Sequence, residues 1–262
     1  MIDVTKGHAY GNDFLLAPAA TLVGDPAATA RALCHRHEGI GADGLILYGL
    51  HDGGATMRLI NADGSPSELS GNGLRCLAAL VARTQRLAAG TTVRVGTDAG
   101  VKTLDLLARD HERYTFRAAM GAPTELRQVQ IPLPGETITA SVLRVGNPQC
   151  VVVGPLPDSD RFSRIGPILS THPMFPAGTN VEFAQVDAQD RIRILIWERG
   201  VGPTQSSGTG SSAAAVAAAA HGGAARAIDV IAPGGIQHVE WTDQEIYLTG
   251  WAEIVMQGMW LA

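Results

Sequence analysis

Two short stretches, Ser70–Cys76 (SGNGLRC) and Ser207–Ala213 (SGTGSSA), share the pattern Ser-Gly-x-Gly, and each leads into an apolar segment. Serine is a favoured N-cap residue, so both stretches are predicted to begin helices. A single occurrence would be an ordinary turn into a helix. Because the pattern occurs twice in one chain, it favours a repeated structural unit.

Other landmarks recur in the same order, with offsets of 135 or 137 residues. They comprise a Gly-Asn turn, an aspartate expected to start a helix, a polar residue that ends a strand-like run, and the serine of the repeated pattern. The four pairs are Asn12 and Asn147, Asp25 and Asp160, Asn61 and Glu198, and Ser70 and Ser207. An offset of about half the chain predicts two halves of similar fold.

The expected fold class is α/β (α+β), with two pseudo-symmetric lobes that each curl a mixed β-sheet or barrel around a central helix. The N-terminal lobe is expected to comprise residues 1–116 plus 251–262, and the C-terminal lobe residues 117–250. Helical spacing of apolar residues predicts a first central helix that ends near Gly90. Its counterpart, Ser212–Ala220, has no polar face and is therefore expected to be buried.

Composition excludes several classes of function. The net charge is −5 and no basic run stands out, so neither nucleic acid nor an anionic membrane is an expected partner. The N-terminus lacks the pattern of a signal peptide, and the three cysteines have no paired or metal-type spacing, which together favour a reducing cytoplasm. His35 and His37 lie two residues apart, which does not favour a metal site, and Asp43 is expected to be a structural carboxylate.

A helix start of this kind can bind an anion. Its first N–H groups have no intrahelical acceptor, and the helix dipole places partial positive charge there. If two such starts faced each other, they would hold a carboxylate and place two hydroxyls on opposite faces of its α-carbon. That arrangement suits stereoinversion, in which one group removes a proton and the other returns it.

Gly208–Ala213 also matches a dinucleotide-binding fingerprint, with Asp229 lying 21 residues beyond Gly208. In that motif a strand runs straight into the glycines, whereas ten residues separate Trp197 from Gly208 here. The sequence therefore disfavours a dinucleotide cofactor.

As a set, the motifs GNDF, GIGADGLI, NADGSPSELSGNGLRC, GNPQ, GTNVEF and ERGVGPTQSSGTG resemble those of the diaminopimelate epimerase family. They occur in family order over essentially the whole chain. The resemblance implies an epimerase of the lysine and peptidoglycan pathway that needs neither a cofactor nor a metal, takes a small amino acid as substrate, and is compatible with a homodimer.

The resemblance also implies roles for individual residues. Asn61 and Glu198 would hold the reacting α-amino group, and the backbone N–H groups of Gly71, Asn72, Gly208 and Thr209 would hold the α-carboxylate. The distal end of the substrate would be bound by Asn12, Asn147, Asn180 and Arg199.

Three departures from the family pattern stand out. Gln149 replaces a histidine, Pro203 replaces a glutamate, and the catalytic positions 70 and 207 carry serine where the family has cysteine. A serine hydroxyl is a far weaker acid than a thiol and needs a neighbouring base, and neither loop contains a histidine or lysine. Cys76 lies six residues beyond position 70 and cannot substitute for it.

Three interpretations remain open from the sequence. The chain is an epimerase whose two catalytic cysteines have been replaced, and which is weak or inactive as written. Alternatively, it is a serine-pair relative with isomerase or dehydratase chemistry. In the third interpretation it binds an amino acid without turnover.

Overall fold

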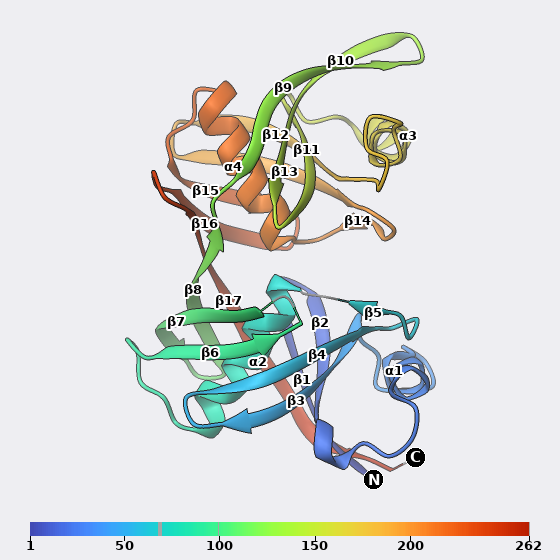
Figure 1. The fold of residues 1–262 in the computed structure, drawn as a ribbon, viewed down its shortest axis with the longest axis vertical. Coiled ribbons are helices and arrows are strands. Elements are labelled where there is room, and N and C mark those ends of the chain that lie inside the picture. The colour runs from blue at the N-terminus through green and yellow to red at the C-terminus, as the bar shows by residue number, and fades with distance from the viewer. Residues whose placement is uncertain (68–69, 99, 262) are drawn as a thin grey trace. The chain divides into compact units, whose positions relative to one another are not determined.

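The β-rich runs of the sequence form strands, and in each half of the chain these strands surround one helix (Figure 1). The computed structural model describes residues 1–67, 70–98 and 100–261. It divides into two units, residues 1–118 with 250–262 and residues 119–249. The fold is the expected mixed α+β class, with few helices and extensive sheet.

The first unit contains a sheet, two α-helices and a short 3-10 helix. Its strands are β1 (Ile2–Ala9), β2 (Asn12–Pro18), β3 (Gly44–His51), β4 (Gly54–Asn61), β5 (Pro66–Ser67), β6 (Thr92–Thr97), β7 (Gly100–Asp110), most of β8 (Arg113–Gly121) and the end of β17 (Ile246–Trp260). Its helices are η1 (Ala19–Thr21), α1 (Pro26–Cys34) and α2 (Gly71–Thr84). Because β17 pairs with both β1 and β8, the sheet closes around α2.

The second unit repeats this plan. Its strands are β9 (Thr124–Leu133), β10 (Glu136–Val145), β11 (Asn147–Val153), β12 (Asn180–Ala188), β13 (Arg191–Glu198), β14 (Gly202–Thr204), β15 (Ala227–Ala232), β16 (Gly235–Trp241) and the start of β17. Its helices are α3 (Ser159–Ser170) and α4 (Gly208–His221).

The strand registers show how closely the two plans agree. Phe14 of β2 lies beside Gly44 of the parallel strand β3, and Gln149 of β11 lies beside Asn180 of the parallel strand β12. The next strand is antiparallel in both units, as β4 pairs with β3 and β13 pairs with β12. A parallel strand then follows in each, β6 beside β4 and β15 beside β13.

Each sheet carries apolar side chains on both faces, as expected for strands covered on two sides. On one face of the first sheet, α2 packs through residues such as Leu77 and Val81. On the other face, α1 packs through Leu33. In the second unit α4 and α3 take the corresponding places, and residues 213–218 of α4 are buried all round, as its composition predicted.

Two local details differ from the sequence-based expectation. The helix α2 ends at Thr84 rather than near Gly90, because Arg86 adopts a left-handed conformation (φ 54°) and the N–H of Leu87 bonds back to the carbonyl of Ala82 (2.9 Å). Leu87 then packs against the hydrophobic core around α2, which stabilises this early end of the helix.

The start of α3 is also different. Its N-cap is Asp158, which accepts a hydrogen bond from the N–H of Arg161 (2.8 Å), so Asp160 lies inside the first turn. In the first unit the expectation is confirmed, because Asp25 caps α1 and Pro26 is its first residue.

The glycines before α4 agree with the sequence-based expectation. The helix begins at Gly208, and the preceding strand β14 folds back on β13 as a hairpin. No strand therefore runs directly into the glycines, which argues against the dinucleotide fingerprint. Among the helices of the described residues, none is both long and apolar enough to cross a membrane.

Candidate functional site

The two Ser-Gly-x-Gly stretches begin the central helices, as predicted. Ser70 is the N-cap of α2, and its Oγ accepts a hydrogen bond from the N–H of Gly73 (3.2 Å). Ser207 is the N-cap of α4, and its Oγ accepts from the N–H of Gly210, also at 3.2 Å. The two serines therefore occupy the same structural position in the two units.

The first turn of each helix presents backbone N–H groups that have no hydrogen-bond acceptor within the helix. In α2 these include the N–H groups of Gly71 and Asn72, and in α4 those of Gly208 and Thr209. Neither first turn contains an acidic residue that would neutralise the positive end of the helix dipole. Both helix starts are therefore suited to an anion such as a carboxylate.

The second glycine of each pattern has a packing role that the sequence did not reveal. A methyl group on Gly73 would lie 3.1 Å from Cδ1 of Ile46 and 3.4 Å from Cβ of Ser70. A methyl group on Gly210 would lie 2.6 Å from Oε1 of Glu182 and 3.2 Å from Cβ of Ser207. Glycine thus makes room for a strand side chain that packs against the start of the helix.

In the first unit, the expected polar residues gather at one end of the sheet. Asn12 begins β2, and Asn61 ends the antiparallel strand β4 opposite Gly44, the first residue of β3. The helix start lies at the same end, because Nδ2 of Asn72 donates to Oδ1 of Asn12 (3.1 Å). Asn61 also donates through Nδ2 to Oγ of Ser65 (3.0 Å), within the loop that leads to the helix.

The side chain of Asn12 is fixed by partners that leave only one orientation of its amide. Its Nδ2 donates to Oδ2 of Asp43 (2.6 Å), which as a carboxylate can only accept. Its Oδ1 accepts from Asn72, whose own Oδ1 accepts from the guanidinium of the buried Arg75. The amides of both asparagines are therefore oriented by charged neighbours.

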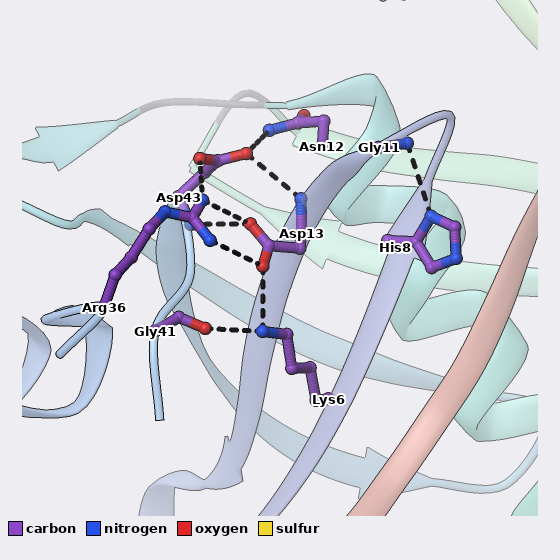
Figure 2. A network of polar contacts seen from close by, with 8 residues as sticks. All are labelled: Lys6, His8, Gly11, Asn12, Asp13, Arg36, Gly41 and Asp43. Carbon is purple, nitrogen blue, oxygen red and sulfur yellow. Dashed lines mark hydrogen bonds and ion pairs between the residues drawn. The ribbon is translucent and has the colours of Figure 1, made fainter. Parts of the chain in front are cut away.

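Asp43 belongs to a network of ion pairs beneath Asn12, shown in Figure 2. Arg36 binds Asp43 at 2.8 Å and Asp13 at 2.9 Å, and Lys6 binds Asp13 at 2.9 Å. Burial raises the pKa of Asp13, but the hydrogen bonds from Arg36 and Lys6 outweigh it and hold this pKa below its ordinary value. Asp43 thus has the structural role that the sequence predicted, because it accepts from Asn12 and pairs with Arg36.

In the second unit, the corresponding residues also meet at one end of the sheet. Asn147 begins β11, Asn180 begins β12, and Glu198 ends β13. Oδ1 of Asn180 accepts a hydrogen bond from the backbone N–H of Arg199 (3.0 Å), which ties the last residues of β13 to the start of β12. The guanidinium of Arg199 donates to the carbonyl of Ala177 (2.7 Å).

The residue that orients Asn147 is Gln149, one of the positions that depart from the family pattern. Its Nε2 donates to Oδ1 of Asn147 (2.6 Å), and its side chain is almost fully buried. No ion pair supports Asn147 within the described part of the chain. Pro203, the second departure, lies opposite Trp197 in the hairpin of β13 and β14.

Glu182 is a site residue that sequence reasoning missed. It is the third residue of β12 and has no exposed surface, and neither carboxyl oxygen has a hydrogen-bond partner within the described ranges. Burial raises its pKa well above the ordinary value, and the negative charge of Glu198 raises it further. A signal was present in the sequence, since NVEF places one acidic residue between apolar neighbours in a strand that is covered on both faces.

None of the three cysteines can take the place of a thiol at position 70 or 207. All three are buried, and burial raises the pKa of the thiols of Cys34 and Cys76 to about 12. Burial also raises the pKa of Cys150. Cys76 points into the core around α2, which confirms that it is no substitute for a thiol at position 70. Within the described residues, no group of three histidine, cysteine or acidic side chains is placed to hold a metal ion.

Comparison with known proteins places this geometry in a family. The family model described as diaminopimelate epimerase matches residues 4–126 and 141–255. The chain belongs to the diaminopimelate epimerase family. It is 40% identical over 280 residues to the diaminopimelate epimerase of Desulforudis audaxviator, covering 99% of both chains. It is 38% identical over 279 residues to that of Synechocystis, covering 98% of both.

Solved structures that are more distant in sequence share the fold of this diaminopimelate epimerase family member. A predicted epimerase from Pseudomonas aeruginosa superposes with a TM-score of 0.77 at 14% identity, over 100% of both chains. A probable proline racemase from Agrobacterium radiobacter superposes with a TM-score of 0.70 at 19% identity, over 100% of this chain and 93% of the other. At these identities the likeness concerns the fold alone.

Proposed function

We propose that this protein is a cofactor-independent epimerase of the diaminopimelate type, in which serines at both base positions make proton transfer slow. In the reaction, an α-carbon of LL-diaminopimelate would be inverted to give the meso isomer, a step of the lysine and peptidoglycan pathway. The observation that carries the proposal is the pair of serine-capped helix starts, each at the end of a sheet that presents asparagine or glutamate.

The proposed substrate contacts follow from the chemistry of these groups. The N–H groups of Gly71, Asn72, Gly208 and Thr209 suit the α-carboxylate, because helix starts attract anions. Glu198 supplies a negative charge and Asn61 an amide oxygen, which suit the α-ammonium group. The second amino-acid head of the substrate would meet the set Asn12, Asn147, Asn180 and Arg199.

Inversion by two bases requires that Ser70 and Ser207 act on opposite faces of one α-carbon. One serine would accept the α-proton, and the other would deliver a proton from the opposite side. The positive ends of the two helix dipoles would stabilise the negative charge that develops on the substrate. The slow step is proton removal, since an unassisted hydroxyl is a much poorer base than a thiolate.

Binding and proton exchange can be measured separately. Calorimetric titration with LL- and meso-diaminopimelate should give saturable binding, and variants N61A and E198Q should weaken it, while D98N on the first unit's surface should not. In heavy water, the proposal expects slow loss of the α-proton signal in the NMR spectrum. Saturable binding without exchange would instead favour a binding protein, and no binding of either isomer would rule out the substrate.

A further inference from the structure

The second unit contains a buried carboxyl group at its helix start that has no counterpart among the described residues of the first unit. Glu182 of β12 and Ile46 of β3 occupy matching places. Each lies on a strand parallel to the one before it, since Glu182 is beside Val151 and Ile46 is beside Leu16. Each packs against the second glycine of its Ser-Gly-x-Gly pattern. One helix start therefore meets a carboxyl group and the other a hydrocarbon side chain.

This carboxyl group lies near Ser207, beside Gly210, although no hydrogen bond joins the two side chains within the described residues. Oε1 of Glu182 and Cβ of Ser207 both lie within 3.2 Å of the point where a Cβ of Gly210 would be. The Oγ of Ser207 is turned toward the same residue, because it accepts the N–H of Gly210. Both carboxyl oxygens of Glu182 are buried without a hydrogen-bond partner within the described ranges, so they have capacity left for a proton.

We propose that Glu182 is the proton acceptor and donor for Ser207, and that the second helix start alone can therefore remove an α-proton. This inference rests on the proposed epimerase-type function and assigns a positioning residue that acts through Ser207. It supplies the neighbouring base that the chemistry of Ser207 requires, since the loop before Ser207 contains neither histidine nor lysine.

The proton transfer balances without any further reactant. As the substrate Cα–H bond breaks, its electron pair stays on Cα, and its proton forms a bond to Oγ of Ser207. The hydroxyl proton of Ser207 leaves at the same time and bonds to the carboxylate of Glu182. In the reverse direction Ser207 returns a proton to Cα and is reprotonated by Glu182. No alkoxide accumulates, which removes the main obstacle to a serine base.

The charges around Glu182 determine when it is ready to accept a proton. Two titratable groups on the flanking strands interact with it, the thiol of Cys150 on β11 and the carboxyl of Glu198 on β13. From the third side, the first turn of α4 contributes no charged side chain but offers the positive end of its dipole. The raised pKa of Glu182 keeps its proton in the free site, and a substrate ammonium group beside Glu198 would reduce the repulsion and favour ionisation.

Within the part of the first unit that the structure describes, Ser70 has no such partner for proton transfer. Ile46 cannot accept the proton of Ser70, so a proton delivered by Ser70 would leave an unfavourable alkoxide. The inference therefore predicts that the α-proton exchanges with solvent while the configuration at the α-carbon is retained. One of the two isomers, LL or meso, exchanges its α-proton with heavy water, and inversion is much slower than exchange.

The test compares E182Q and E182D with the unmodified protein. Glutamine keeps the size of the side chain but cannot accept the proton. The rate of α-proton exchange should fall by about 10²-fold or more in E182Q, while the dissociation constant measured by calorimetry should change little. E182D should recover part of the exchange. The exchange rate should rise with pH as Glu182 ionises in the unmodified protein, and this rise should be absent in E182Q.

Each outcome bears on one proposal or the other. Exchange in E182Q at an unchanged rate and with an unchanged pH profile would overturn the role of Glu182, as would binding by the unmodified protein without exchange at any pH. Failure to bind either isomer would contradict the proposed substrate instead. A second measurement needs no substrate, because a protonated carboxylic acid gives an infrared C=O band. This band should be present in the unmodified protein and missing in E182Q, and its absence from both would also overturn the inference.

Discussion

The two helix starts share one backbone design but differ in the side chain placed against it. Ser70 and Ser207 cap their helices with the same hydrogen bond at the same distance of 3.2 Å. The difference lies in Ile46 and Glu182, which occupy equivalent strand positions and lie 27 and 28 residues before Gly73 and Gly210, the glycines against which they pack. A duplicated scaffold can thus keep its geometry while the chemistry of its two halves diverges.

The hydrogen-bond partners of Asn12 and Asn147 differ in a similar way. Asn12 is held by Asp43 and the ion pairs of Arg36 and Lys6, whereas Asn147 is held by the neutral amide of Gln149. Charged hydrogen bonds are stronger than neutral ones and fix a side chain more firmly. The first unit therefore holds its asparagine more firmly, whereas our proposal assigns the more reactive serine to the second unit.

The largest expected effect comes from placing a thiol at both helix starts. In the double variant S70C/S207C, formation of meso-diaminopimelate from the LL isomer should increase by about 10²- to 10⁴-fold, because a thiol at a helix start ionises near neutral pH. NMR or chiral chromatography would follow the product. The variant S206C, with a thiol one residue away, is the control and should show no increase. Unchanged inversion in the double variant would contradict the two-base assignment.

A smaller gain is expected when the first helix start receives the carboxyl group of the second. The variant I46E should allow α-proton exchange from the isomer that is inert in the unmodified protein, and I46Q should not. Burial of the polar group should lower the free energy of unfolding by about 1–3 kcal/mol, measured by urea denaturation of both variants. If I46E folds and binds but the isomer stays inert, Ile46 is not what distinguishes the two starts.

These comparisons also indicate how far sequence reasoning extends. The repeated Ser-Gly-x-Gly pattern was enough to predict the central helices and their caps, because capping depends on a few adjacent residues. Apolar runs predicted the main strands, because this pattern is also set by residues that are adjacent in the sequence. The end of α2 at Thr84 was missed because it depends on Leu87 packing against the core, and Glu182 was missed because its position beside Gly210 arises only when β12 and α4 pack together.

The buried carboxyl group of Glu182 should make the free energy of unfolding depend on pH. Glu182 has a raised pKa in the folded protein, so the folded state holds its proton more tightly than the unfolded state. Stability should therefore fall as pH rises above the ordinary glutamate value toward the folded pKa, by about 1.4 kcal/mol for each pKa unit of difference. Urea denaturation at several pH values should show a smaller fall for E182Q. Parallel curves for the two proteins would contradict this protonation state.

The smallest effect is expected at the support of Asn12. The variant D43N removes the carboxylate that orients Asn12 and pairs with Arg36, and it should weaken diaminopimelate binding by roughly fivefold, corresponding to about 1 kcal/mol. E38Q, which removes an exposed negative charge from the same region, is the matched control for calorimetry. Equal affinities for D43N and the unmodified protein would show that the network does not serve binding.

The most direct measurement follows the α-protons of LL- and meso-diaminopimelate in heavy water with the unmodified protein and with E182Q. The account predicts that one isomer exchanges with retention, that the other exchanges far more slowly, and that E182Q suppresses the faster reaction. Equal exchange of both isomers, unaffected by E182Q, would contradict the claim that a carboxyl group at one helix start makes the two halves unequal.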